Sequence, residues 1–252
     1  MKYSCITLGS CRVLGLFDKN LISNLKFNSI HSCNFYTSGG CDFIGKHHTP
    51  LQILYALKYI EGEVTINYDD LKRLFSMIEE RVNWYKGFCP NYNFNQSIVN
   101  LKENIKYQKI FIFEICSSKE TVNPDTLVPR QGELIDWNYD KNLNISDLEF
   151  FENNLYSLIE YVNNKYDYPL IILIGHIRNW LFNDEHKYIE NRQIIYEKLK
   201  EYTSYYKNII LFDPAEILYK EDMLDDWHYK SEVFERLHNH IYNLIDNYFQ
   251  RY

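Results

Sequence analysis

The stretch Ile110-Phe111-Ile112-Phe113 is a run of apolar residues that favour β-structure, with no polar residue between them. Similar runs occur at residues 170–174 and 209–212. Continuous runs of this kind are typical of parallel strands that are buried on both faces, whereas strands with one solvated face alternate apolar and polar residues. These three stretches therefore predict a parallel sheet at the centre of the molecule.

The rest of the chain alternates helical patterns with short apolar runs. Thr49-Pro50 provides an N-cap and a first-turn proline ahead of a helix. We expect strands at residues 3–8, around 28–37, and at 109–115, 169–174 and 208–212. We expect helices at 51–60, 69–84, 95–107, 188–202 and 231–248. Strands that alternate with helices predict an α/β fold, here a three-layer α/β/α sandwich with a mostly parallel five-stranded sheet in one domain, residues 1–252.

One further helix is expected after residue 145. Ser146 and Glu149 have the spacing of a capping box, and Ile145 and Phe150 are placed as its hydrophobic staple. A buried stripe at helical spacing follows, formed by Leu148, Phe151, Leu155, Leu158 and Val162. The segment just before it, residues 117–145, has no clear period. We interpret it either as a lid or substrate-binding insertion, or as a plain surface excursion.

Composition excludes several classes of function. The 252 residues are 46% hydrophobic, which suits one large domain. The net charge of −7 and the lack of a dense basic run argue against nucleic acid as a partner. No apolar run approaches the ~18 residues of a membrane span, and the start leaves no room for a signal peptide before the first strand. We therefore expect no membrane partner, a cytoplasmic location, and reduced thiols for the six cysteines, which form no C-x-x-C.

Two short motifs at opposite ends of the sequence are suited to nucleophilic catalysis. Gly9-Ser10-Cys11 follows the first apolar run, and Asp225-Asp226-Trp227-His228 precedes the last helical stretch. A serine hydroxyl is a poor nucleophile until an imidazole takes its proton and a carboxylate orients that imidazole. Ser10, His228 and Asp225 are candidates for these three roles. A serine after a strand is also commonly a helix N-cap, and an Asp-x-x-His is commonly a surface turn.

The order of these residues resembles that of the SGNH/GDSL hydrolase superfamily, in a divergent Gly-Ser-Cys form similar to a branch found among polysaccharide-modifying proteins. The resemblance implies that Ser10 is the nucleophile, His228 the general base and Asp225 its orienting acid. It also implies an oxyanion hole formed by the backbone amides of Ser10 and Gly40, with Gly39 as the neighbouring alternative.

The chain departs from this family after the third expected strand. The Gly-x-Asn-Asp block is absent, and Glu114-Ile115-Cys116-Ser117-Ser118 stands in its place. Ser117, or Asn179 after the next strand, would have to supply the missing oxyanion donor. Cys11 competes with Ser10 as nucleophile, because a thiolate needs less activation than a hydroxyl.

Further candidates follow the other expected strands. Ligands of parallel α/β sheets bind at the carboxyl ends of the strands. We therefore predict a substrate-binding set at these ends, made of Gly39, His176, Arg178, Asn179 and Trp227. Asp226 competes with Asp225, although the Asp-x-x-His spacing favours Asp225. Trp84, Trp137 and Trp180 are either sugar-stacking platforms or half-buried core residues.

No metal is expected. The five candidate ligands His31, Cys33, Cys41, His47 and His48 match no zinc-finger or zinc-ribbon spacing. The glycine-loop motifs that hold nucleotide phosphates are also missing.

The resemblance and the expected cytoplasmic location together favour an acetyltransferase. It would move acetyl from acetyl-CoA, as a co-substrate, to a hydroxyl or amino group of a sugar or nucleotide sugar, as in polysaccharide biosynthesis. A carbohydrate or small-ester esterase (a deacetylase) with the same triad is the second hypothesis. A non-catalytic carbohydrate-binding domain is the third.

Overall fold

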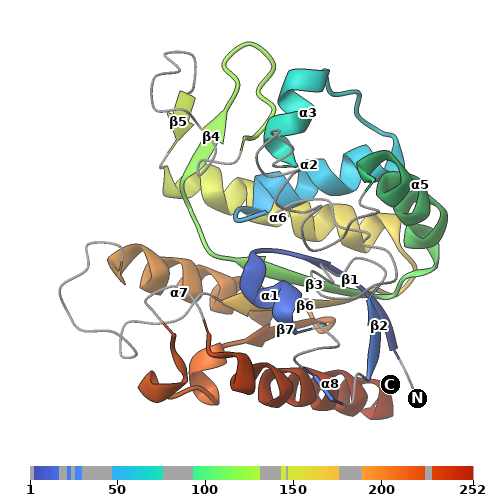
Figure 1. The fold of residues 1–252 in the computed structure, drawn as a ribbon. Coiled ribbons are helices and arrows are strands. Elements are labelled where there is room, and N and C mark those ends of the chain that lie inside the picture. Colours follow the sequence, from blue (N-terminus) through green and yellow to red (C-terminus); the bar gives the residue numbers. More distant parts are fainter. Residues whose placement is uncertain are drawn as a thin grey trace.

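The computed structural model describes residues 3–16, 22–23, 26–29, 47–75, 93–130, 143–145, 147–175, 189–224 and 229–251. Four parallel strands form the body of its sheet (Figure 1), in the order β1 (Tyr3–Leu8), β3 (Ile110–Ile115), β6 (Leu170–Gly175) and β7 (Ile209–Phe212). The short strand β2 (Phe27–Ser29) pairs in parallel with the other side of β1. Every residue of β3 and β6 is buried. The α/β class and the parallel central sheet are thus confirmed. Residues 30–37 of the second expected strand lie outside the described residues.

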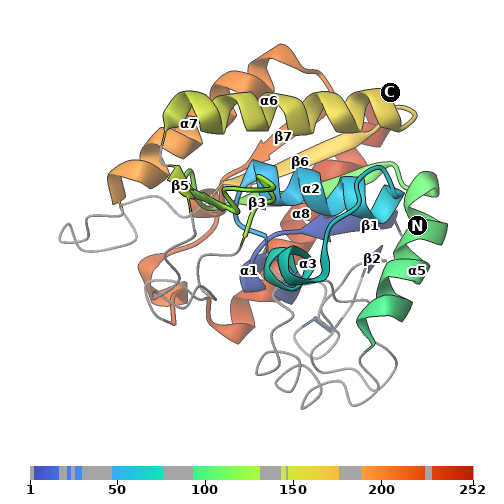
Figure 2. The ribbon, with the colours of Figure 1, turned by 90° about the horizontal axis from the view of Figure 1, so that it is seen from above.

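Helices cover both faces of the sheet (Figures 1 and 2). On one face lie α2 (Pro50–Glu61), α3 (Tyr68–Leu74), α5 (Phe94–Asn104) and α6 (Leu148–Lys165), and α2 and α6 run side by side. On the other face lie α7 (Ile189–Tyr205) and α8 (Phe234–Arg251). The short helix α1 (Cys11–Gly15) follows β1 directly. Short 3-10 turns complete the described chain: η1 (Ile105–Tyr107), η4 (Pro214–Glu216), η5 (Lys220–Asp222) and η6 (Ser231–Val233).

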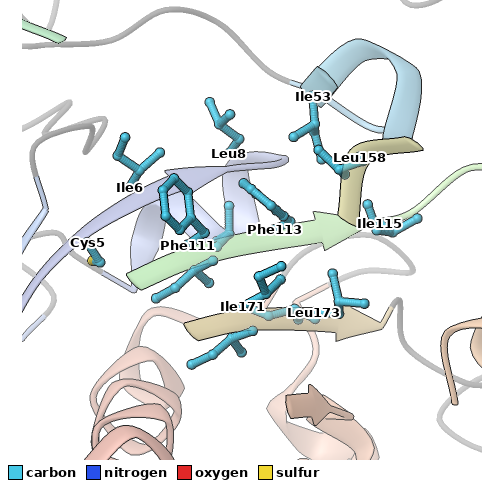
Figure 3. Packing of buried hydrophobic residues seen from close by; sticks show 14 of the residues in the cluster. Cys5, Ile6, Leu8, Ile53, Phe111, Phe113, Ile115, Leu158, Ile171 and Leu173 are labelled. Carbon is cyan, nitrogen blue, oxygen red and sulfur yellow. The ribbon is translucent and has the colours of Figure 1, made fainter. Parts of the chain in front are cut away.

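The apolar core lies between the sheet and these helices. Figure 3 shows Ile53 of α2 and Leu158 of α6 on the side of the sheet toward which Leu8 points. All three side chains are fully buried, as are Phe111 and Phe113 of β3. Burying one such side chain stabilises the fold by about 1.5–3 kcal/mol. The burial of Ile53 and Leu158 against the sheet therefore holds α2 and α6 on this face.

Local sequence signals explain where α2 begins and ends. The Thr49 side chain accepts a hydrogen bond from the Gln52 amide, and Pro50 occupies the first turn, as predicted. Gly62 ends the helix with φ 78°, a left-handed conformation that glycine adopts without steric cost.

The predicted capping box of α6 is wrong. Asp147, not Ser146, is the N-cap, and its carboxylate accepts from the Glu149 amide. The predicted buried stripe is confirmed, because Phe151, Leu155, Leu158 and Val162 are all buried and Leu148 packs against the core.

The segment 117–145 contains regular structure that its sequence does not indicate. Strand β4 (Glu120–Val122) pairs antiparallel with β5 (Leu143–Ile145), and Val122 also bridges Pro129. The loop between them is tied to α3 by Asp70, which is fully buried and accepts hydrogen bonds from Asn123, Thr126 and Arg130. Residues 131–142 lie outside the described residues.

Among the helices that the structure describes, none has the length and apolar character needed to cross a bilayer.

Candidate functional site

The turn Gly9-Ser10-Cys11 lies at the carboxyl end of β1. Strand β1 has β2 on one side and β3 on the other, so the chain reverses its direction of winding between β1 and β3. Crevices at such reversal points are the usual ligand sites of open α/β sheets. This position makes the turn the leading candidate site among the described residues.

Ser10 is held by three hydrogen bonds. It is 3% exposed. Its backbone amide donates to Glu114 Oε2 over 2.9 Å, and its hydroxyl donates to the same oxygen. Its Oγ also accepts from the Arg12 amide over 3.3 Å, which is the contact of a helix N-cap at the start of α1. The serine is therefore fixed in orientation, and the capping role considered for it is present in the structure.

Glu114 forms a buried ion pair with Arg12. Arg12 Nε lies 2.6 Å from Glu114 Oε1, and the two side chains are 7% and 1% exposed. Burial alone would raise the pKa of the Glu114 carboxyl, but the Arg12 charge and the Ser10 hydrogen bonds outweigh it, so this pKa is lowered. Glu114 is thus a carboxylate at neutral pH. Together, Ser10, Arg12 and Glu114 form what we call the turn cluster.

Gly9 allows the turn to approach β3 this closely. A Cβ at position 9 would lie 2.7 Å from Glu114 Cβ and 2.7 Å from Val13 Cγ1. Contacts this short are not tolerated, so a side chain here would force Glu114 or Val13 to move.

A small pocket lies beside the turn cluster, on the face covered by α8. Arg12 and Glu114 form its charged wall, and apolar residues from α1, β6, β7 and the C-terminal region form the rest. One of these is Tyr229, which is 7% exposed and forms an isolated antiparallel β-bridge with Met223.

A second segment, residues 47–49, crosses the carboxyl ends of β1 and β3. The His47 amide donates to Gly9 O over 3.0 Å, and the amides of Cys116 and Ser117 both donate to His48 O over 3.0 Å. Since the Ser10 amide donates to Glu114 and the Ser117 amide to His48, neither N–H points at an open position.

Glu120, the first residue of β4, is another buried carboxyl of the described residues. It is 3% exposed, accepts from Gln52 Nε2 over 3.1 Å and from the Thr121 amide, and is hydrogen-bonded to the Thr49 hydroxyl. Burial raises its pKa to about 7, because these hydrogen bonds offset only part of the desolvation. The start of α2 is thereby joined to β4 through a carboxyl that changes charge near neutral pH.

Of the predicted site residues, only Ser10 and Ser117 belong to the described residues. The others lie outside them: Gly39, Gly40, His176, Arg178, Asn179, Asp225, Trp227 and His228. Asp226, the alternative to Asp225, and the four tryptophans also lie outside.

Two members of the turn cluster were missed. Sequence reasoning placed Glu114 at a strand end but gave it no role, and it did not consider Arg12. A charged residue inside the otherwise apolar strand Ile110–Ile115 was the available signal.

Within the described part of the chain, no three His, Cys, Asp or Glu side chains are grouped as metal ligands would be. His47 and His48 belong to this part, while His31, Cys33 and Cys41 do not.

The sequence matches no protein-family model, and no curated protein is a significant match to it.

Proposed function

We propose that this protein transfers acyl groups through a covalent intermediate on the turn Gly9-Ser10-Cys11. The observation that carries the proposal is the turn cluster: a buried serine that donates to an ionised carboxylate at the reversal point of the sheet. The pocket beside it is also lined by Tyr229, the neighbour of the predicted base His228.

The proposed reaction has two halves. Ser10 Oγ attacks the acyl carbonyl carbon of acetyl-CoA, its proton passes to His228, and the CoA thiolate leaves with that proton. A sugar hydroxyl or amine then attacks the acyl-serine, gives its proton to His228, and releases Ser10 with its proton restored. Asp225 orients His228, as the SGNH resemblance implies.

Glu114 is a positioning residue in this scheme. Its lowered pKa makes it a weak base, so it does not accept the serine proton permanently at neutral pH. Its contact with the hydroxyl fixes the direction of Oγ, and Arg12 balances its charge so that the site is not net negative.

Cys11 is the alternative nucleophile of the same turn. The Ser10 amide and hydroxyl are already engaged by Glu114 and Arg12, as in a capped turn. Cys11 follows directly as the first residue of α1. The same fixed turn would then serve to position a thiol, and the reaction would otherwise be unchanged.

The SGNH-like fold, the acyl acceptor and the acyl donor are part of the same proposal. Counting β2, the strand order β2-β1-β3-β6-β7 is compatible with an SGNH-like five-stranded sheet. We favour transfer to a sugar or nucleotide sugar over hydrolysis, because the family's Gly-x-Asn-Asp block is replaced and Ser10 is shielded from water. Acetyl-CoA as donor suits a cytoplasmic location.

Intact-mass spectrometry tests the proposal, since an acyl-enzyme is covalent. Incubation with acetyl-CoA should add one acetyl group to the peptide that contains Ser10 and Cys11, and an amino sugar or nucleotide sugar should discharge it. Ser10→Ala should abolish labelling while Cys11→Ala stays active. Ser157→Ala is the matched control, because Ser157 is exposed on α6 and its hydroxyl donates to the Asn153 carbonyl.

Each other result points to a different conclusion. Labelling that survives Ser10→Ala and disappears in Cys11→Ala assigns the nucleophile to Cys11. Rapid hydrolysis of acetyl esters, with acetyl-CoA ignored for every sugar, identifies an esterase. No labelling by any acyl donor, with the fold intact, leaves Ser10 as a helix cap and favours a non-catalytic domain.

The pH dependence tests the base. An unperturbed imidazole titrates near ~6.5, so turnover should fall as the pH drops through about 6 to 7. Asp225→Asn should lower turnover roughly 10²- to 10⁴-fold without unfolding the protein. Full activity in that variant would remove Asp225 from the mechanism and direct attention to Asp226.

A further inference from the structure

Two buried carboxyl groups contact the chain around β4, and they differ in their counter-charge. Asp70 is fully buried and pairs with the Arg130 guanidinium, whose Nη2 lies 2.9 Å from Asp70 Oδ1. Glu120 is 3% exposed, and within the described part of the chain its hydrogen-bond donors are all uncharged. A buried carboxylate without a cation is costly, so Glu120 is favoured as the neutral acid.

The charged groups beside Glu120 do not balance it. The titratable residues next to its contacts are His47, His48, Lys119 and Arg130. The Arg130 guanidinium is held by Asp70, and the His47 ring packs edge-on against Phe75. His48 is half-buried and Lys119 is exposed to solvent. Burial, which the hydrogen bonds only partly offset, therefore raises the pKa of Glu120 to about 7.

The hydrogen bonds also show which oxygen carries the proton of the neutral acid. Gln52 Oε1 accepts from the His48 amide over 2.8 Å, so its Nε2 is the atom that donates to Glu120 Oε1, over 3.1 Å. The Thr121 amide donates to the same oxygen over 3.2 Å. Since Oε1 already accepts from two N–H groups, the proton lies on Oε2, where the contact is the Thr49 hydroxyl, the N-cap of α2.

This network continues to the candidate site through the backbone of residues 47–49. Gln52 connects Glu120 to the His48 amide, and the His48 carbonyl accepts from the amides of Cys116 and Ser117 at the end of β3. The His47 amide donates to Gly9 O in the turn that carries Ser10. Residues 47–49 thus connect Glu120 to the carboxyl ends of both β1 and β3.

We propose that the protonation state of Glu120 controls whether residues 47–49 stay bound across the carboxyl ends of β1 and β3. The neutral acid keeps them bound, and the carboxylate favours a local opening in which it gains hydration. An opened carboxyl has the ordinary pKa of 4.5, so the bound form loses its advantage as the pH rises from 4.5 to about 7. Opening removes the bond to Gly9 O and so loosens the turn, whether or not Ser10 or Cys11 reacts.

Amide hydrogen exchange at pH 6 and pH 8 tests the proposal. Division of each measured rate by the intrinsic rate at that pH gives an opening constant. For the amides of His48, Cys116 and Ser117 this constant should rise roughly 10-fold from pH 6 to pH 8, as the two pKa values require. The amides of Asn123 and Leu127 are the internal control, because their loop is held by the Asp70–Arg130 pair, and their opening constants should stay the same.

Glu120→Gln should abolish the rise. Its carbonyl oxygen can accept from Gln52 and Thr121 while its NH2 group donates to Thr49, so it reproduces the neutral acid. Glu63→Gln is the matched control and should keep the rise, because Glu63 pairs with Lys165 and its lowered pKa leaves it ionised at both pH values.

Three results would overturn the proposal: no rise in the wild type, a rise that persists in Glu120→Gln, or an equal rise at Asn123 and Leu127, which would show that the opening is not local. The wild-type comparison needs no variant, so it stands even if Glu120→Gln does not fold. It also needs no acyl donor, so its outcome is independent of the proposed function.

Discussion

Replacing Arg12 by methionine should destabilise the protein strongly at neutral pH. The substitution keeps most of the apolar stem but removes the charge that balances Glu114, which is 1% exposed. Breaking a buried pair by removing one partner typically costs about 3–5 kcal/mol, because the remaining charge is left uncompensated. We therefore expect Arg12→Met to lower the free energy of unfolding by about 3–5 kcal/mol at pH 7, as measured by urea denaturation.

The effect should depend on pH in a direction that identifies its cause. In the wild-type protein the pKa of Glu114 is lowered, so its contribution is present above the ordinary value of 4.5 and is lost as the pH falls below it. Without Arg12, burial would raise this pKa instead. The folded variant then takes up a proton more readily than the unfolded chain, and its deficit relative to wild type should shrink as the pH is lowered from 7 to 5.

Two further variants complete the measurement. The double variant Arg12→Met with Glu114→Gln removes both charges of the ion pair, so it should recover much of the free energy of unfolding that Arg12→Met loses. Comparison of the double variant with the two single variants gives the coupling energy of the pair. Arg236→Met is the control, since the Arg236–Asp222 pair is exposed and should contribute less than about 1 kcal/mol. A loss below about 1 kcal/mol in Arg12→Met, or a deficit that does not change between pH 7 and 5, would refute the reasoning.

Three other perturbations have defined outcomes. Gly9→Ala should destabilise the protein by about 1–3 kcal/mol and lower any acyl transfer, because its Cβ would force Glu114 or Val13 to move. A melting temperature equal to that of the wild type would contradict this. Burial raises the pKa of Glu120 to about 7, so the contribution of Glu120 to the free energy of unfolding should fall as the pH rises from 4.5 to about 7. The free energy of unfolding of the wild type minus that of Glu120→Gln should decrease over this range, and a difference that does not change with pH would contradict the assignment. Burial lowers the pKa of His238, whose Nε2 accepts a hydrogen bond from the Lys26 amide. The contribution of His238 to the free energy of unfolding should therefore fall as the pH drops below about 6.5. Denaturation curves of His238→Gln, measured at several pH values, should lack this pH-dependent loss.

Strands β3 and β6 were predictable because every residue in them is buried. Every residue of a run such as Ile110–Phe113 is apolar, which predicts a strand with both faces buried. The structure shows this burial at every position of β3. The start of α2 was equally clear, since Thr49-Pro50 combines a cap with a proline that only the first turn accepts. At α6 two good capping residues stand side by side, and pattern alone could not choose Asp147 over Ser146.

The turn cluster could not be predicted from local pattern, because Glu114 is 102 to 104 positions from Arg12 and Ser10 along the chain. Only the register of β1 against β3 brings them together. Leu8 of β1 lies opposite Phe113 of β3, so the residues that follow them, Gly9 and Glu114, are also close together. The turn after Gly9 then brings Ser10 and Arg12 to the Glu114 carboxylate. An isolated glutamate in an apolar strand signals a buried partner but does not identify it.

The position of β1 between β2 and β3 also bears on how the protein is made. Its pairing with β3 joins residues that are synthesised about 105 positions apart, Leu8 and Phe113. At translation rates of about 5–20 residues per second, β1 would wait roughly 5–20 s for this partner. Through that interval an apolar strand with an unpaired edge is available to chaperones or to other nascent chains. The arrangement that assembles the candidate site thus makes the first strand the most exposed to misassembly during synthesis.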